Sequence, residues 1–236
     1  SQTSVHHNWQ DELWLVAGGI FGGSLYFFTE NTALGITQAS NVSFIICTAP
    51  LLTTILSLLF YKSEKASKGL IYGSLLALMG VGLIVFNGSF VLKISPIGDL
   101  LTLLAALSWA FYSLIIKKMA GRYPTIFITR KIFFYGVLTI LPAFLLHPLH
   151  PDTAVLLQPA VLFNLLFLAV LASLICYVLW NVVLKQLGTV RASNYIYLNP
   201  LVTMIASFLI LDEKITLVAL GGAACIVCGV YWAEKK

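Results

Sequence analysis

The chain has 236 residues, of which 59% are hydrophobic and only 10% are charged, and its formal net charge is +5. Soluble domains average about 45–50% apolar and about 25% charged residues, so this composition excludes an ordinary soluble globule. We therefore predict an all-α integral membrane protein whose first partners are membrane lipids.

Eight apolar segments follow a polar beginning at residues 1–12, and each is near the ~20 residues that an α-helix needs to cross a bilayer. They cover residues 13–34, 40–61, 69–87, 98–117, 126–147, 160–184, 191–211 and 215–233. Glycines lie four apart or close to it in the first, third and eighth segments. Small residues at this spacing let helix backbones approach closely, so we expect tight helix pairs there.

The basic residues fall almost entirely on one side of the predicted membrane. When the connections are numbered alternately, twelve Lys and Arg residues lie on one side and only Lys93 and Lys214 on the other. The twelve are Lys62, Lys65, Lys68, Lys117, Lys118, Arg122, Arg130, Lys131, Lys185, Arg191, Lys235 and Lys236. Because cytoplasmic loops carry an excess of Lys and Arg, we expect a multi-pass protein of the inner (cytoplasmic) membrane with both ends of this chain in the cytoplasm. The basic balance thus reports topology, and no nucleic-acid partner is predicted.

Residues 43–59 and 193–209 are two copies of one sequence. At an offset of 150 positions, eight residues are identical, including Ser43/Ser193, Pro50/Pro200 and Thr53/Thr203. The match continues at an offset of 149 with Gly73/Gly222 and Gly80/Gly229. Segments one to three therefore correspond to segments six to eight. Each segment comes five segments before its counterpart, and because five is odd, the two copies cross the membrane in opposite orientations. Such inverted repeats are typical of secondary transporters, whose substrate sites lie near the bilayer midplane between the copies.

The repeat also predicts the domain organisation. Residues 1–88 form a first, partial repeat of three helices, and residues 97–236 form a second repeat of five helices. A complete first copy would have five as well. We therefore expect the eight helices to come from a ten-helix, 5+5 inverted-repeat fold, in a chain shortened by its first two helices.

Three stretches of the chain, residues 30–60, 98–118 and 176–216, resemble the EamA family of the drug/metabolite transporter superfamily. The resemblance covers nearly the whole chain. It implies two five-helix repeats, cytoplasmic termini and a central cavity that alternates between the two faces of the membrane. It also implies export or exchange of small metabolites, often amino acids or drug-like compounds.

Glu30 is the only carboxylate well inside an apolar segment. An ionised carboxylate in a bilayer is costly and by default marks an ion, proton or substrate site. Glu30 is also about one helical turn from the predicted outer end at Leu34, where water reaches it, so an interfacial role stays open. The neighbouring Asn31 recurs as Asn181, which favours either a shared structural hydrogen bond or a cavity lining.

Pro50 and Pro200 each remove one backbone hydrogen bond in the middle of an apolar segment. A packing kink is the plain interpretation, whereas a broken helix whose loosened backbone lines a site is the sharper one. Their recurrence in both copies favours the second. Thr53 and Thr203, three residues later, are placed either to bond back to the backbone or to face the cavity.

The seventh segment carries a polar stripe that should face protein or water rather than lipid, formed by Tyr195, Asn199 and Thr203, beside a second stripe with Tyr197. Aromatic residues deep in the fourth and sixth segments suit a small organic ligand. The predicted substrate cavity is thus lined by Glu30, Asn31, Pro50, Thr53, Trp109, Tyr112, Ser113, Tyr177, Asn181, Tyr195, Tyr197, Asn199, Pro200 and Thr203.

The functional prediction is a secondary transporter, a permease or exporter that moves a small organic metabolite by alternating access. Proton exchange through Glu30 and plain facilitated diffusion are the two options for the driving force. A channel or a lipid-handling protein without alternating access is the alternative. No phosphate-binding loop and no catalytic motif occurs, so neither an enzyme nor a cofactor is predicted. His147 and His150 lie in a proline-rich loop, which predicts a solvated turn rather than a metal site.

Overall fold

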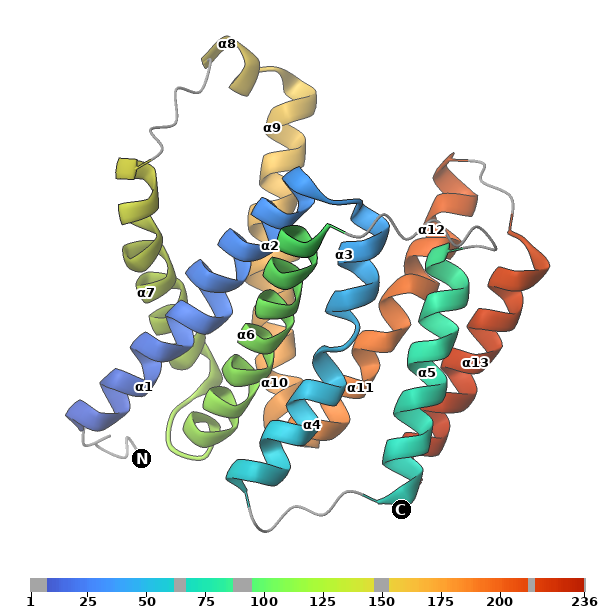
Figure 1. Ribbon diagram of the computed structural model, residues 1–236. Coiled ribbons are helices and arrows are strands. Elements are labelled where there is room, and N and C mark those ends of the chain that lie inside the picture. The colour runs from blue at the N-terminus through green and yellow to red at the C-terminus, as the bar shows by residue number, and fades with distance from the viewer. Residues whose placement is uncertain (1–7, 62–66, 87–94, 147–152, 212–214, 236) are drawn as a thin grey trace.

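The computed structural model describes residues 8–61, 67–86, 95–146, 153–211 and 215–235, and all regular elements in these ranges are helical (Figure 1). The elements are α1 (Trp9–Gly19), η1 (Ile20–Ser24), α2 (Leu25–Ile36), α3 (Ala39–Ile46), α4 (Ala49–Phe60), α5 (Lys68–Phe86), α6 (Pro96–Ala120), α7 (Thr125–Leu146), α8 (Thr153–Leu156), α9 (Pro159–Leu166), η2 (Phe167–Ile175), α10 (Cys176–Leu187), α11 (Thr189–Asn194), η3 (Tyr195–Leu198), α12 (Asn199–Leu211) and α13 (Leu217–Glu234).

Six helical stretches of the described chain are long and apolar enough to cross a bilayer, and they match six of the eight predicted segments. They are Asn41–Phe60, Lys68–Phe86, Pro96–Ala120, Thr125–Ala143, Pro159–Leu187 and Leu217–Glu234. The other two predicted segments are helical but are not among these six. They are the segment that contains Glu30, in α1, η1 and α2, and the segment formed by α11, η3 and α12.

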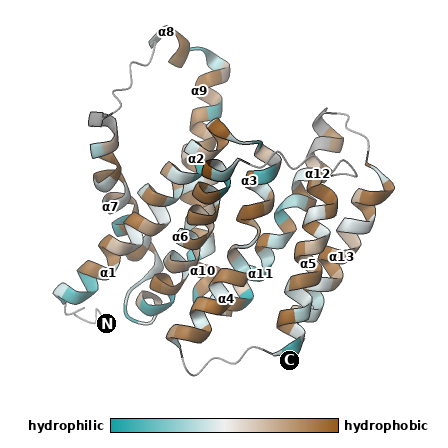
Figure 2. Cartoon of the chain, viewed as in Figure 1, coloured by the Kyte–Doolittle hydropathy of each residue, from teal (hydrophilic) through white to brown (hydrophobic). Residues whose placement is uncertain are grey.

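The helices form a bundle in which most long elements run between the same two ends (Figure 1). The start of α1, the α6–α7 turn and the end of α13 lie at one end, close to both chain termini. The helix middles are mostly hydrophobic, while hydrophilic residues gather at the first turn of α1 and near the C-terminus (Figure 2). Lys62, Lys65, Lys93, Lys214 and Lys236 lie outside the described residues.

The close packing predicted for the glycine-rich segments is confirmed for α5 and α13, which run antiparallel and in direct contact. A Cβ atom on Gly80 would lie 2.5 Å from the Gly222 carbonyl oxygen, and one on Gly229 would lie 2.5 Å from the Gly73 carbonyl oxygen. Neither position has room for a side chain, because the opposing backbone already occupies the space.

The two predicted copies share their helix interruptions. The first segment is interrupted by the π-helical turn η1 and the sixth by the π-helical stretch η2. In the second segment α3 ends at Ile46 and α4 begins at Ala49, just before Pro50. In the seventh, η3 ends at Leu198, just before Pro200. The prolines thus sit in the first turn of a new helix, where a missing N–H has no cost.

The surroundings of η1 and η2 differ. η1 and α1 pack against α6 and α7, with Leu15 and Gly22 buried between them. Almost all side chains of α9 and η2 are instead exposed, including Phe163, Phe167 and Leu171. In the described part of the bundle, the helix that contains η1 is therefore covered by neighbouring helices, whereas the corresponding helix that contains η2 is not.

Candidate functional site

Aromatic side chains from four elements meet inside the bundle, and we call them the aromatic cluster. Its members are Tyr26 and Phe27 on α2, Trp109 and Tyr112 on α6, Phe133 on α7, and Tyr177 and Trp180 on α10. The ring of Trp109 lies 5.1 Å from Tyr26, 5.7 Å from Tyr177 and 5.8 Å from Trp180, measured between centroids. These separations are within the range in which aromatic pairs attract each other.

Hydrogen bonds hold the inner side of the aromatic cluster in place. The Tyr112 hydroxyl donates to Asn181 Oδ1 at 2.7 Å, and Asn181 Nδ2 donates to Thr129 Oγ1 at 2.9 Å. The Tyr177 hydroxyl donates to the Gly22 carbonyl oxygen in η1 at 2.7 Å. All four side chains are buried, so each bond satisfies a group that would otherwise be costly in the interior.

Glu30 lies on the outer side of the same cluster. The Tyr26 hydroxyl donates to Glu30 Oε1 at 3.0 Å, and the carboxylate is partly exposed. No Lys or Arg of the described ranges forms an ion pair with it. The helix continues to Ile36, six residues beyond Glu30, so the carboxylate lies about 9 Å from the helix end. The helix thus ends two residues beyond the predicted Leu34.

Two hydrogen-bond donors of the aromatic cluster have no partner in the described part of the protein. The indole Nε1 atoms of Trp109 and Trp180 are both buried and both unpaired there. Leaving a buried donor unsatisfied costs about 1–3 kcal/mol, so such groups call for a reason. A bound molecule that offers an acceptor would supply one.

Several other predicted residues lie near this cluster but do not all face it. Ser113 is buried and donates to the Trp109 carbonyl oxygen at 3.0 Å. Asn31 is exposed and its amide donates to the Phe27 carbonyl oxygen at 2.7 Å. The recurring asparagines therefore play different parts, since only Asn181 belongs to a buried network.

The predicted stripe of Tyr195, Asn199 and Thr203 does not face the protein interior, because all three residues are exposed. The neighbouring stripe is the buried one, with Ser193 and Tyr197 both fully buried. The 3-10 turn η3 interrupts the α-helical spacing between Tyr195 and Asn199.

Pro50 and Thr53 are buried in α4, which packs against α11, and Pro200 is buried at the start of α12. Thr54, not Thr53, bonds back to the Pro50 carbonyl oxygen, at 2.9 Å. The Thr53 hydroxyl has no hydrogen-bond partner among the described residues. Pro50, Thr53 and Pro200 form no ring contact or hydrogen bond with the aromatic cluster among the described residues, although Ala49, beside Pro50, packs near Trp109 and Trp180.

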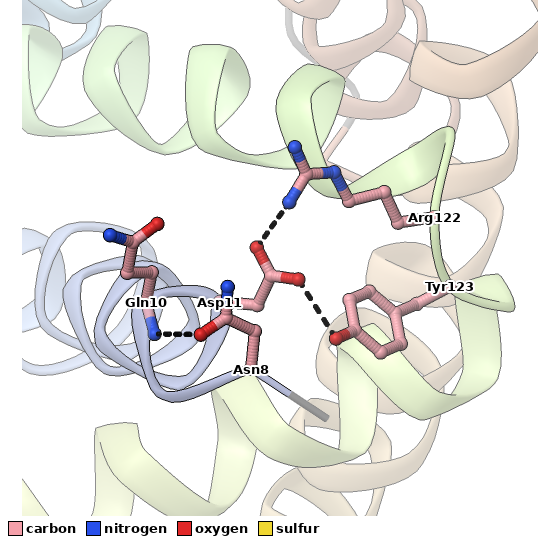
Figure 3. A network of polar contacts seen from close by, with 5 residues as sticks. All are labelled: Asn8, Gln10, Asp11, Arg122 and Tyr123. Atoms are coloured by element: carbon pink, nitrogen blue, oxygen red, sulfur yellow. Dashed lines mark hydrogen bonds and ion pairs between the residues drawn. The ribbon is translucent and has the colours of Figure 1, made fainter. Parts of the chain in front are cut away.

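Two ion pairs that were not predicted from the sequence join the start of α1 to the α6–α7 turn and to α7, and Figure 3 shows the first of them, between Asp11 and Arg122. Asp11 is buried and accepts from Arg122 at 2.6 Å and from the Tyr123 hydroxyl at 3.0 Å. Burial, together with the hydrogen bond to Asp11, raises the pKa of Tyr123.

Asn8 caps the start of α1, because its side-chain oxygen accepts a hydrogen bond from the backbone N–H of Gln10. An Asn before an acidic first turn is a helix-start signal that could have shown α1 beginning at Trp9 rather than at residue 13.

A second ion pair is formed by Glu12, the residue that follows Asp11 on α1. Lys131 Nζ lies 2.7 Å from Glu12 Oε1, which also accepts from the Tyr135 hydroxyl. Lys131 was predicted only as a topology marker, so its role in joining α7 to α1 is an addition from the structure.

An apolar crevice of about 260 Å³ borders the aromatic cluster between η1 and α7, and Phe27, Phe133 and Tyr177 are among its lining residues. In the described ranges no group of His, Cys, Asp and Glu side chains is arranged to hold a metal ion. His147 and His150 lie outside these ranges.

Comparison with known proteins gives one family and several relatives. The profile of the "EamA-like transporter family" matches residues 2–86 and 96–233. An "Uncharacterized transporter" of Archaeoglobus fulgidus is 30% identical over 217 residues, which are 91% of this chain and 73% of that protein. A "Probable amino-acid metabolite efflux pump" of Salmonella typhimurium is 29% identical over 182 residues, 73% of this chain and 60% of that protein.

A solved crystal structure has the same fold. It superposes with a TM-score of 0.80 at 18% sequence identity, covering 98% of this chain and 77% of the other.

Proposed function

Because this chain belongs to the EamA-like transporter family and is a membrane transporter, we propose that it moves a small organic metabolite across the cytoplasmic membrane as a secondary transporter with alternating access. The relative in Salmonella typhimurium named as a "Probable amino-acid metabolite efflux pump" supports amino-acid metabolites as candidate cargo. We further propose that eight helices span the membrane, in an inverted-repeat arrangement.

The contact between α5 and α13 is the observation that carries this proposal. Gly80 meets Gly222, and Gly229 meets Gly73. In the sequence repeat, Gly73 corresponds to Gly222 and Gly80 corresponds to Gly229. If each glycine is replaced by its counterpart in the other copy, the Gly80–Gly222 contact becomes the Gly229–Gly73 contact, and the reverse also holds. Contacts of this crosswise kind are expected at a pseudo-two-fold axis in the membrane plane, where alternating access works by moving one repeat against the other.

The matched helix interruptions support the same mechanism. η1 and η2, and the breaks before Pro50 and Pro200, occur at equivalent positions of the two copies. Interrupted helices at a repeat interface are where transporters bend and bind cargo. The two termini lie at one end of the bundle together with the Asp11–Arg122 pair, and we assign this end to the cytoplasm.

Counterflow in proteoliposomes tests the proposal. A thermal-stability screen with amino acids, nucleosides and cationic drugs first identifies a ligand, since specific binding raises apparent stability by mass action. We then expect uptake of the labelled ligand to rise when unlabelled ligand is trapped inside. Uptake that is unaffected by internal ligand would identify a channel and contradict alternating access.

The driving force is tested at Glu30. If proton exchange occurs through this carboxylate, Glu30→Gln abolishes the stimulation of transport by a pH gradient while counterflow persists. If the stimulation remains complete in the variant, Glu30 carries no coupling proton. A wild-type protein without any stimulation would point to facilitated diffusion.

A further inference from the structure

The aromatic cluster contains two unpaired hydrogen-bond donors among the described residues. The Trp109 and Trp180 indole N–H groups are buried, lack acceptors within the described ranges, and belong to rings 5.8 Å apart. Nearby donors are already used, because the Tyr112 and Tyr177 hydroxyls bond to Asn181 and Gly22. A molecule bound at the cluster would therefore gain most from a hydrogen-bond acceptor placed at the two indoles.

The cluster also contacts a carboxyl group through Tyr26. Glu30 accepts one hydrogen bond, from Tyr26, whose ring lies 5.1 Å from that of Trp109. The electron-rich faces of Tyr and Trp rings attract cations, so rings and carboxylate favour the same kind of ligand group.

No positive charge in the described part of the protein balances Glu30. Lys131, on the helix that carries Phe133, is paired with Glu12. Lys117, on the helix that carries Trp109, lies over the Tyr61 ring at 4.2 Å. When Glu30 is ionised, the cluster and its carboxylate therefore have a net charge of about −1, which a bound cation would neutralise in an environment where an unbalanced charge is expensive.

We propose that the preferred ligand is an organic monocation that also carries a neutral hydrogen-bond acceptor. Its ammonium group lies beside Glu30 and the Tyr26 and Trp109 rings, and its acceptor receives the Trp109 and Trp180 N–H groups. A zwitterion is disfavoured because it would leave the site with the uncompensated charge of Glu30, whereas a monocation leaves the occupied site neutral. This inference rests on the proposed transport function and narrows the class of its cargo.

Three compounds of one shape separate these contributions. 4-(2-aminoethyl)benzamide is a cation with a neutral acceptor, 2-phenylethylamine is a cation without one, and 4-(2-aminoethyl)benzoate is a zwitterion. Binding to the purified protein in detergent is measured at pH 7 by the concentration dependence of the thermal midpoint. We expect the benzamide to bind at least about tenfold more tightly than the zwitterion, and roughly three- to tenfold more tightly than the amine without an acceptor.

Variants assign each preference to a residue. Glu30→Gln keeps the size of the side chain and should bring the benzamide-to-benzoate affinity ratio close to one. Trp180→Phe should reduce the benzamide affinity but leave that of 2-phenylethylamine unchanged. Asp99→Asn, which changes a carboxylate at the start of α6 away from the cluster, is the matched control and should keep both ratios.

The proposal is overturned if the zwitterion binds wild type as tightly as the benzamide, if no compound binds at millimolar concentration, or if Glu30→Gln keeps the wild-type ratio. These results are separable from the transport test. Counterflow of any solute without the expected charge preference would contradict only the ligand class. Glu30-dependent binding without counterflow would contradict only the transport mechanism.

Discussion

The contact between α5 and α13 makes a quantitative prediction for Gly229→Ala. The added Cβ would lie 2.5 Å from the Gly73 carbonyl oxygen and 2.5 Å from the Ala77 nitrogen. Both are backbone atoms, so no side chain can rotate away to make room. Because ordinary contact begins near 3.4 Å, the two helices must separate locally by about 0.9 Å.

A separation of this size is costly throughout the contact. A radial gap of about 0.5–1 Å removes roughly a quarter to a half of the attraction between facing atoms. Overpacking of a close contact typically costs about 1–3 kcal/mol, and we expect the upper part of this range because backbone meets backbone. In a chain of this length the thermal midpoint should fall by roughly 4–12 °C.

Unfolding in detergent, followed by circular dichroism or by loss of monodispersity, measures the effect. Gly221→Ala on the same helix is the control, since a Cβ there meets nothing within 4 Å. Gly80→Ala, the repeat equivalent of Gly229→Ala, should cost about as much, because its Cβ would lie 2.5 Å from the Gly222 oxygen. If Gly229→Ala unfolds at the same temperature as Gly221→Ala, the close approach does not stabilise the bundle and our reasoning is wrong.

Three further predictions concern the buried polar groups. Asn181→Leu should destabilise the protein by about 1–3 kcal/mol because the buried Tyr112 hydroxyl loses its acceptor, and adding Tyr112→Phe should recover part of the loss in a double-mutant cycle followed by thermal unfolding. Arg122→Ala should lower the free energy of unfolding by about 1–2 kcal/mol, because Asp11 stays buried with only Tyr123 as a donor among the described residues. This loss of stability should be smaller at high salt, and an equal loss in 0.05 M and 1 M salt would contradict an ionic origin. Burial and the hydrogen bond to Asp11 favour the neutral form of Tyr123 and raise its pKa, so its contribution to stability is complete below the ordinary value of about 10 and is lost as the pH rises through the higher folded-state value; the alkaline decrease in thermal midpoint should therefore be smaller in Tyr123→Phe than in wild type.

The sequence determined the membrane helices and their likeness to a transporter family. Partition into a bilayer depends on the summed hydropathy of about 20 residues, which is a local property that can be read along the chain. Close approach at Gly73, Gly80, Gly222 and Gly229 was likewise predictable, because small residues have one main use between membrane helices. Trp109, Tyr112 and Tyr177 were correctly singled out as deep aromatic residues, and they do meet in one cluster.

Only the tertiary structure decided which polar groups meet. Asp11 and Arg122 are 111 residues apart, and Tyr112 and Asn181 are 69 apart, so no local pattern links them. The rotation of each helix about its axis also depends on small local departures from α-helical geometry. The 3-10 turn at Tyr195–Leu198 breaks the regular spacing, and only the packed structure shows that Tyr197 is buried while Asn199 is exposed. Apolar residues are interchangeable against lipid, whereas hydrogen bonds and ion pairs depend on direction and distance, and these exist only once the helices have packed.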